Sequence, residues 1–302
     1  MSTPPTLTLP PGVVTRSVQT PRGAFAALHA EPELSAGATD DAVPTAVLIP
    51  GFTGSKEDFI AVLAPLARAG FRVLAYDQRG QYESPGDPPP EGWVLDAFAT
   101  DALAVCAQAA PGPVHLLGHS FGGLVARAAA LAQPDAFASL TLLGSGPAGL
   151  TGRQAELLRQ MAETMPRIGL AATWAVKYSL DVENGWQPPE DPAVADFLER
   201  RFLANDTDGL AAIARLLTEV PDRTQALRDT GLPVLVACGE DDDVWSPKLQ
   251  SEMASQLGAP CVFVPGAAHS PAAENAEETA RVLAQFWSSL GRGPLDGGGA
   301  QR

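Results

Sequence analysis

One stretch of the chain decides its fold: Val114-His115-Leu116-Leu117-Gly118-His119-Ser120-Phe121-Gly122-Gly123. An apolar run leads into a serine with a glycine two residues away on each side, and residues 124–131 continue with a helix-forming composition. This order predicts a strand, a sharp turn and a helix, with Ser120 in a strained backbone conformation that lifts its hydroxyl above the sheet. Glycine is expected at 118 and 122 because a Cβ would collide where strand and helix pass closely. Ser120 would also lie at a helix N-terminus, where free N–H groups stabilise developing negative charge.

The composition fits one large globular core with room for an inserted subdomain. Of the 302 residues, 45% are hydrophobic and 18% are charged, which favours an ordinary globular protein over a disordered or fibrous one. The net charge of −15 repels phosphates and anionic membranes, so we expect neither nucleic acid nor a membrane as partner. Cys106, Cys238 and Cys261 are spaced singly, so neither a disulfide framework nor a zinc site is predicted.

The start of the chain has no basic segment followed by an apolar run, and no later stretch is apolar enough to span a membrane. We therefore expect a cytoplasmic protein, and the sequence leaves its oligomeric state open.

Strand-like and helix-like segments alternate along most of the chain. An antiparallel pair of strands is expected first, at 13–18 and 24–30. Further strands are expected at 46–49, 71–76, 113–118, 138–143, 233–238 and 261–264, and further helices at 55–70, 93–110 and 273–290. Such alternation predicts an α/β fold with a mostly parallel sheet covered by helices on both faces. The terminal segments 1–12 and 291–302 are expected to be flexible.

Residues 146–221 interrupt this alternation. Their apolar residues recur at helical spacing without a strand, which predicts four helices. We interpret them as an inserted helical cap above the carboxyl ends of the strands, where α/β proteins bind ligands. The core would then comprise residues 1–145 and 222–302. The alternative is that these are additional core helices.

A serine nucleophile needs a base, usually histidine, which is itself oriented by a carboxylate. His269 follows a predicted strand in a loop from which its side chain can reach back over the sheet. The other histidines favour structural roles: His29 and His115 lie inside predicted strands, and the turn directs His119 away from the serine. His269 is therefore the predicted base.

Four acidic residues, 240–243, follow the strand predicted at 233–238 and offer the carboxylate. Asp242 is the preferred acid, Asp243 is the alternative and Asp241 is ranked third. Four adjacent carboxylates are also typical of a solvated turn.

Four motifs of this chain resemble those of the α/β-hydrolase superfamily. They are the elbow Gly118–Gly123, the acid motif Gly239–Asp242, the histidine loop Gly266–Pro271 and the loop Asp77–Ser84, which is similar to D-x-R-G-x-G-x-S. The resemblance covers nearly the whole chain and implies an α/β-hydrolase fold with an inserted helical cap. The chain order serine, aspartate, histidine agrees with it.

The resemblance also implies that the backbone N–H groups of Phe52 and Phe121 form an oxyanion hole. Three positions depart from the family pattern, because Pro50 replaces a histidine and Tyr82 and Ala268 each replace a glycine. None of the three departures removes a catalytic group.

Serine at the elbow favours acyl transfer to water, because relatives that open epoxides or remove halides carry an aspartate there. We expect a serine hydrolase that cleaves an uncharged carboxylic ester through an acyl-Ser120 intermediate, with no metal or organic cofactor. The same fold also serves aminopeptidases, thioesterases, perhydrolases and carbon–carbon bond hydrolases. A non-catalytic ligand receptor built on this fold is a further alternative.

The small-molecule substrate is expected to meet an apolar wall. Phe52 and Phe121 are candidates from the core, and the candidates from the cap are Trp174, Leu158, Met161 and Met165. Lys56 and Arg79 are the cations expected near the relevant loops, without a cluster that would pair a substrate carboxylate.

Overall fold

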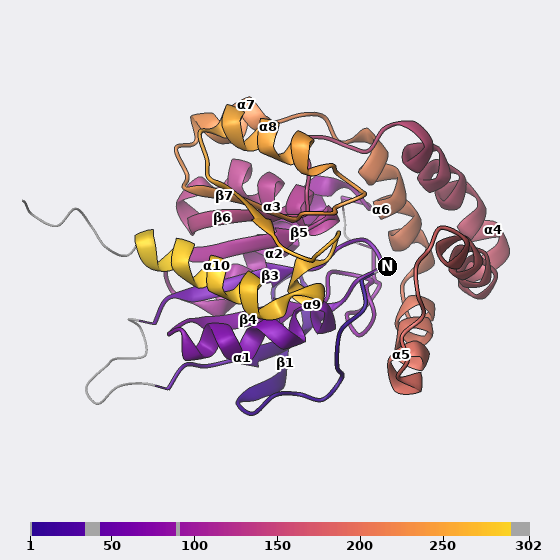
Figure 1. Ribbon diagram of the computed structural model, residues 1–302, viewed down its shortest axis with the longest axis horizontal. Coiled ribbons are helices and arrows are strands. Elements are labelled where there is room, and N and C mark those ends of the chain that lie inside the picture. The colour runs from indigo at the N-terminus through magenta and orange to yellow at the C-terminus, as the bar shows by residue number, and fades with distance from the viewer. Residues whose placement is uncertain (1, 34–42, 89–90, 291–302) are drawn as a thin grey trace, which may run out of the picture.

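The computed structural model of the protein describes residues 2–33, 43–88 and 91–290 (Figure 1). Its described part contains an eight-stranded sheet in the order β1-β2-β4-β3-β5-β6-β7-β8. The strands are β1 (Val13–Thr20), β2 (Gly23–Ala30), β3 (Thr45–Ile49), β4 (Arg72–Tyr76), β5 (Val114–His119), β6 (Phe137–Leu143), β7 (Val234–Gly239) and β8 (Cys261–Val264). β2 pairs antiparallel with β1 and β4, and the remaining neighbours are parallel. The predicted mostly parallel sheet is confirmed, whereas the tail 291–302 lies outside the described residues.

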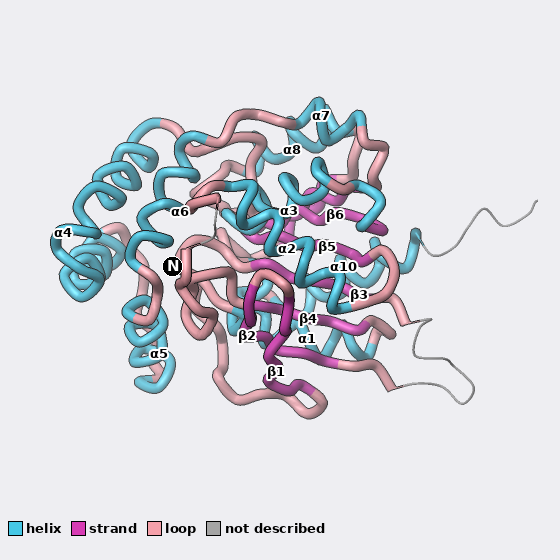
Figure 2. Tube along the Cα trace, turned by 180° about the vertical axis from the view of Figure 1, so that it is seen from behind, coloured by secondary structure: helices cyan, strands magenta, loops and turns pink. Residues whose placement is uncertain are grey.

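Helices cover both faces of this sheet (Figures 1 and 2). α1 (Ile60–Arg68) and α10 (Ala276–Leu290) pack on one face, and α2 (Leu95–Ala109), α3 (Phe121–Ala132) and α8 (Pro247–Leu257) pack on the other. Because successive strand residues point to opposite faces, Leu116 belongs to one apolar cluster and Leu117 to the other. This explains the continuous apolar runs of the central strands, which are buried on both sides.

Two predicted helices are divided in the structure. The segment expected at 55–70 begins with a 3₁₀ turn, η2 (Lys56–Phe59), before α1. The last helix, expected at 273–290, is split into α9 (Pro271–Glu274) and α10. Asn275 causes the break, because its side-chain amide donates to the Pro265 carbonyl at 2.9 Å and its side-chain oxygen accepts the Glu278 N–H at 3.3 Å, which caps α10. The pattern of apolar residues does not reveal such a cap.

Residues 146–221, which lie between β6 and β7, contain three helices, α4 (Gly152–Glu183), α5 (Pro192–Leu203) and α6 (Thr207–Glu219), and a short helix, α7 (Thr224–Asp229), follows them before β7. α4 bends at Gly169, whose φ of 79° is not helical, so four straight helical segments result, as the sequence indicates. We call α4 to α6 the helical insertion. Its three helices lie beside one another at one end of the sheet (Figures 1 and 2). No helix among the described residues combines the length and the apolar character needed to cross a lipid bilayer.

The N-terminal segment contacts the helical insertion. Its proline- and threonine-rich composition favours flexibility, but Pro4 is buried and Leu7 packs against the apolar interior of the insertion. Arg201 on α5 also donates to the Ser2 carbonyl at 2.8 Å. These contacts are long-range, so the local composition cannot indicate them.

Candidate active site

Ser120 occupies the turn between β5 and α3, with φ 54° and ψ −120°. A positive φ is costly for a residue with a side chain, by about 1–3 kcal/mol, and such strain collects at functional sites. A Cβ at Gly118 would overlap the carbonyl of Gly122, and a Cβ at Gly122 would overlap the carbonyl of Ile49. The structure therefore has the predicted strand, turn and helix, and it shows why glycine is required at both flanking positions.

Three residues that are far apart in the sequence meet at the carboxyl ends of parallel strands. Ser120 follows β5, Asp242 follows β7, and His269 follows β8. His269 Nε2 lies 3.0 Å from Ser120 Oγ, and His269 Nδ1 lies 3.0 Å from Asp242 Oδ1. A neutral imidazole protonated on Nδ1 donates to the carboxylate and leaves Nε2 free to accept the serine proton. The side chains of Asp241 and Asp243 are exposed, so Asp242 is the member of the acidic run that reaches the histidine.

Asp242 is buried and its carboxylate accepts several hydrogen bonds. Oδ1 also accepts the N–H groups of Val244 at 2.9 Å and Trp245 at 3.3 Å, and Oδ2 accepts the side-chain amide of Gln250 at 2.8 Å. Burial opposes ionisation, but the hydrogen bonds from His269, Val244 and Gln250 outweigh it and lower the pKa of Asp242. The carboxylate is thus held ionised and oriented toward His269.

Gln250 lies on α8, a helix that the sequence analysis does not predict. Its signal is present in Ser246-Pro247, because serine is a favoured N-cap and proline a favoured first helical residue.

The loop expected to supply one oxyanion donor is held by two buried glutamines. Gln78 Nε2 donates to the Pro50 carbonyl at 3.0 Å. Gln81 Nε2 donates to the carbonyls of Gly51 and Phe52, at 2.8 and 3.0 Å. A Cβ built on Gly51 would lie 3.1 Å from Ser120 Cβ, so this loop passes directly beside the serine. Both glutamines belong to the Asp77–Ser84 motif, whose anchoring role is not evident from the sequence.

Phe121, the other proposed oxyanion residue, begins α3 directly after Ser120. Its ring is buried and meets the ring of Phe98 edge to face, with centroids 5.6 Å apart. Its backbone adjoins the serine, while its side chain belongs to the apolar layer between the sheet and α2.

The other histidines have partners of their own. His115 Nδ1 lies 2.8 Å from Ser139 Oγ, and its ring stacks on Trp287 at 5.4 Å. His119 Nε2 lies 2.7 Å from the backbone carbonyl of His269. His29 is buried in β2, away from the serine. Of the four histidines, His269 is the one whose side chain bonds Ser120.

The four candidate pocket residues of the helical insertion divide into two groups. Met161, Met165 and Trp174 lie in or against the apolar interior of the insertion, where the Trp174 ring is 5.3 Å from that of Phe202. Leu158 packs instead against the apolar cluster beneath α2 and α3. Phe52 contacts both clusters, so it lies where the insertion meets the core.

Both cations near the site are engaged by carboxylates. Lys56 Nζ lies 2.9 Å from Asp77 and 2.6 Å from Glu83. Burial would lower the pKa of Lys56, but the surrounding carboxylates raise it above its usual value. Arg79 Nε lies 2.7 Å from the buried Asp101. Neither cation is therefore available to pair with the carboxylate of a charged substrate.

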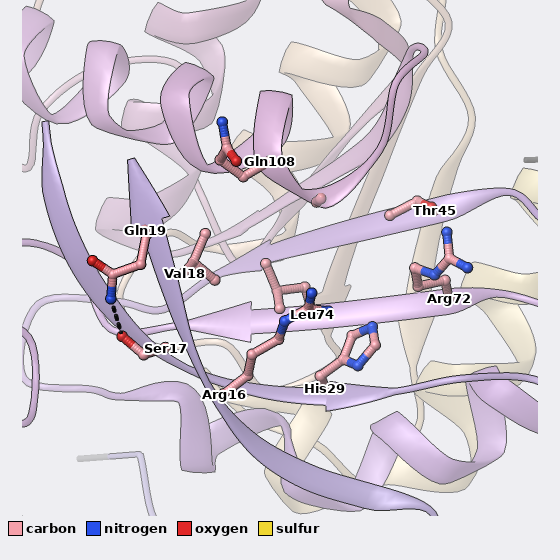
Figure 3. Close-up of a pocket in the computed structure, with 10 residues that line it drawn as sticks. Arg16, Ser17, Val18, Gln19, His29, Thr45, Arg72, Leu74 and Gln108 are labelled. Atoms are coloured by element: carbon pink, nitrogen blue, oxygen red, sulfur yellow. Dashed lines mark hydrogen bonds between the residues drawn. The ribbon is translucent and has the colours of Figure 1, made fainter. Parts of the chain in front are cut away.

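A separate cavity of about 240 Å³ lies beside β1, β2 and the first residues of β3 and β4 (Figure 3). Its lining includes His29, Thr45 and Arg72 but none of the triad residues. Glu31 pairs with Arg72 at 3.0 Å, and Glu31 Oε1 lies 3.3 Å from His29 Nε2. Because β3 and β4 begin there, this cavity lies at the opposite strand ends from Ser120.

The architecture is similar to that of solved hydrolases. The structure of a thermophilic esterase from Thermogutta terrifontis matches with a TM-score of 0.72 over 92% of this chain and 99% of that chain. The two sequences are 24% identical, so this likeness establishes the fold alone.

Curated sequences add two relatives. A pimeloyl-[acyl-carrier protein] methyl ester esterase of Methylococcus capsulatus is 29% identical over 269 residues, which cover 82% of this chain and 95% of that protein. The sn-1-specific diacylglycerol lipase ABHD11 of Mus musculus is 34% identical over 113 residues, 37% of this chain and 36% of that protein. The chain spans less than half of the length of the first curated relatives it matches: 37%, 41% and 36%. The alpha/beta hydrolase family model matches residues 46–282, and the chain therefore belongs to that family.

Proposed function

We propose that this protein is a serine hydrolase that cleaves uncharged carboxylic esters through an acyl-Ser120 intermediate. The observation that carries the proposal is the continuous hydrogen-bonded path from Ser120 Oγ through His269 to Asp242, with two links of 3.0 Å. The same geometry meets the requirements of a nucleophile, a base and an orienting acid.

In the first half of the reaction, His269 Nε2 accepts the Ser120 proton while Oγ attacks the ester carbonyl carbon. The N–H groups of Phe52 and Phe121 stabilise the tetrahedral oxyanion, and Asp242 stabilises the imidazolium. The intermediate collapses, the alcohol leaves with the proton from His269, and the acyl group stays on Ser120. In the second half, His269 deprotonates a water that attacks the acyl carbon, and collapse of this intermediate releases the carboxylic acid while His269 returns the proton to Ser120 Oγ.

The ester assignment and the preference for neutral acyl groups have separate support. The relative aligned over most of its length is named as a methyl ester esterase. Lys56 and Arg79 are engaged by carboxylates, and burying an unpaired substrate charge would cost several kcal/mol. In this proposal the helical insertion acts as a cap, because Phe52 contacts its apolar interior beside the serine.

Covalent labelling with a fluorophosphonate and steady turnover of p-nitrophenyl butyrate test the proposal together. Ser120→Ala should abolish labelling and lower kcat by several orders of magnitude with little change in Tm, because a single hydroxyl is lost. Ser145→Ala removes a buried hydroxyl beside Gly123, on the helix that follows Ser120, and serves as the matched control. Retained turnover in Ser120→Ala would refute the proposed function. Labelling of the wild type without ester turnover would also refute it and would favour a ligand receptor.

A further inference from the structure

The loop that carries His269 is held by its backbone as well as by its catalytic side chain. The N–H groups of the residues on either side of His269 donate to the carboxylate of Glu274, at 2.5 and 3.3 Å. The carbonyl of His269 accepts a hydrogen bond from His119 Nε2 at 2.7 Å. The backbones of Ala268, His269 and Ser270 are therefore all held by hydrogen bonds, which fixes the position of the His269 side chain.

The contact with His119 determines the tautomer of that ring. A carbonyl oxygen only accepts, so His119 Nε2 carries the proton. Burial, and secondarily the charge of His269, lower the pKa of His119 to about 4, so the ring stays neutral at neutral pH. The two imidazole rings are 5.0 Å apart. A neutral His119 does not repel the imidazolium that His269 forms during the reaction.

His119 also precedes Ser120 in the chain. A closed path therefore runs from Ser120 through one peptide bond to His119, across a hydrogen bond to the His269 backbone, and through the His269 side chain back to Ser120 Oγ. Because His119 is the last residue of β5, the path is attached to a buried central strand. The position of His269 relative to Ser120 is therefore fixed through His119.

We propose that His119 is a positioning residue for His269, with the Glu274 carboxylate as its partner on the other side of the loop. This inference rests on the proposed function. The sequence assigns His119 only a structural role, since the turn directs its ring away from the serine. The ring does avoid Ser120, but it reaches the backbone of the base. A displacement of about 1 Å in such a group costs up to about 100-fold in rate.

Variants that retain or remove the donor separate positioning from general stability. His119→Gln keeps an N–H at the place of Nε2 and should keep kcat within about threefold, whereas His119→Leu should lower kcat about 10- to 100-fold with KM within about twofold. His115→Leu is the matched control, because His115 is a buried histidine of the same strand without contact to the loop. It should lower Tm without lowering kcat. Equal losses in His119→Gln and His119→Leu, or an equal loss in His115→Leu, would overturn the proposal.

Glu274 provides a test at an exposed position, where folding is not at risk. Glu274→Ala should lower kcat about 3- to 10-fold at unchanged KM, and Glu277→Ala, an exposed carboxylate of α10, should leave it unchanged. Unchanged kcat in Glu274→Ala contradicts the role of the carboxylate.

Hydrogen exchange of the segment 265–275, followed by mass spectrometry, requires no turnover. His119→Leu should accelerate this exchange and His119→Gln should not, even if the wild type hydrolyses no ester. The comparison of Ser120→Ala with the wild type tests the proposed hydrolase function separately, so failure of one proposal can be told from failure of the other. Identical exchange in all three proteins would refute the positioning role.

Discussion

Arg201 on α5 donates to Asp58 Oδ1 at 2.6 Å across 143 residues of sequence, and both side chains are almost fully buried. Asp58 Oδ2 also accepts the Ser55 N–H at 3.4 Å, and Arg201 reaches the Ser2 carbonyl. One ion pair therefore joins the helical insertion, the turn after Gly51 and Phe52, and the N-terminal segment.

Removing the arginine should destabilise the protein strongly. Arg201→Met leaves the buried Asp58 carboxylate without its counter-charge, and breaking such a pair costs about 3–5 kcal/mol of unfolding free energy. Urea denaturation measures the change. Arg200→Met, at the exposed neighbouring position, should change the unfolding free energy by about 0.5 kcal/mol or less. The double variant Arg201→Met, Asp58→Asn should recover part of the loss, and a failure to do so would contradict the charge argument.

Asp242→Asn should leave the fold intact and reduce kcat by about 10⁴-fold, because an amide does not hold the His269 tautomer or stabilise the imidazolium as a carboxylate does. Asp243→Asn should have a small effect, because that side chain is exposed. The hydrogen bond from Gln154 goes to the Asp243 backbone carbonyl, so the substitution keeps it. Steady-state kinetics with an activated ester compare the two variants. The reverse ranking would transfer the acid role to Asp243.

The sheet and the convergence of Ser120, Asp242 and His269 can be predicted from the sequence because their signals are local. Apolar runs separated by helical patterns predict a parallel sheet, and the carboxyl ends of parallel strands meet at one edge. Ser120, Asp242 and His269 each lie in the loop or turn that follows such a run, so their convergence is expected. The flanking glycines mark a turn where strand and helix pass closely.

The groups that hold the site could not be predicted in the same way. Gln81 bonds backbone carbonyls about thirty residues away, and Arg201 pairs with a carboxylate 143 residues away. Neither partner is implied by spacing or periodicity, because a backbone carbonyl looks alike at every position and any of the 35 acidic residues could pair with an arginine. The sequence predicts that the His119 ring is directed away from Ser120, but its bond to the His269 backbone depends on how two distant loops pack.

Gln81→Leu tests the support of the oxyanion loop. The change removes donors to the carbonyls of Gly51 and Phe52, so the loop loses the side chain that fixes it beside Ser120. We expect kcat to fall about 10-fold or more, approaching the loss from removing one oxyanion donor, with a smaller change in KM. Gln108→Leu, at an exposed position on α2, is the control. Equal kinetics in Gln81→Leu and the wild type would exclude a catalytic contribution of this anchor.

Stability should fall on acidification because His115 is buried in its neutral form. Burial lowers its pKa from 6.5 to about 4. Between these values the unfolded chain binds a proton that the folded protein does not, so stabilisation present above pH 6.5 is lost as pH falls toward 4. His115→Leu should be less stable at pH 7.5 but should show a flatter decline over this range. Denaturation curves at half-unit pH intervals give the slopes, and equal slopes would contradict the assignment.

Acyl preference is the prediction that bears most directly on the biological substrate. Because Lys56 and Arg79 are already paired, an ester with a free carboxylate on its acyl side would bury an uncompensated charge. We expect kcat/KM for neutral short and medium acyl chains to exceed that for anionic chains of equal length by about 10-fold or more, since each 1.4 kcal/mol is worth about a factor of ten. Trp174 lies in the apolar interior of the helical insertion, so Trp174→Leu should alter the chain-length profile more than the rate on an acetate ester. Val176→Ala, whose side chain is exposed on the same helix, is the control. A panel of esters that varies acyl length and charge decides the matter: a preference for anionic acyl chains would overturn the substrate class while leaving the triad in place.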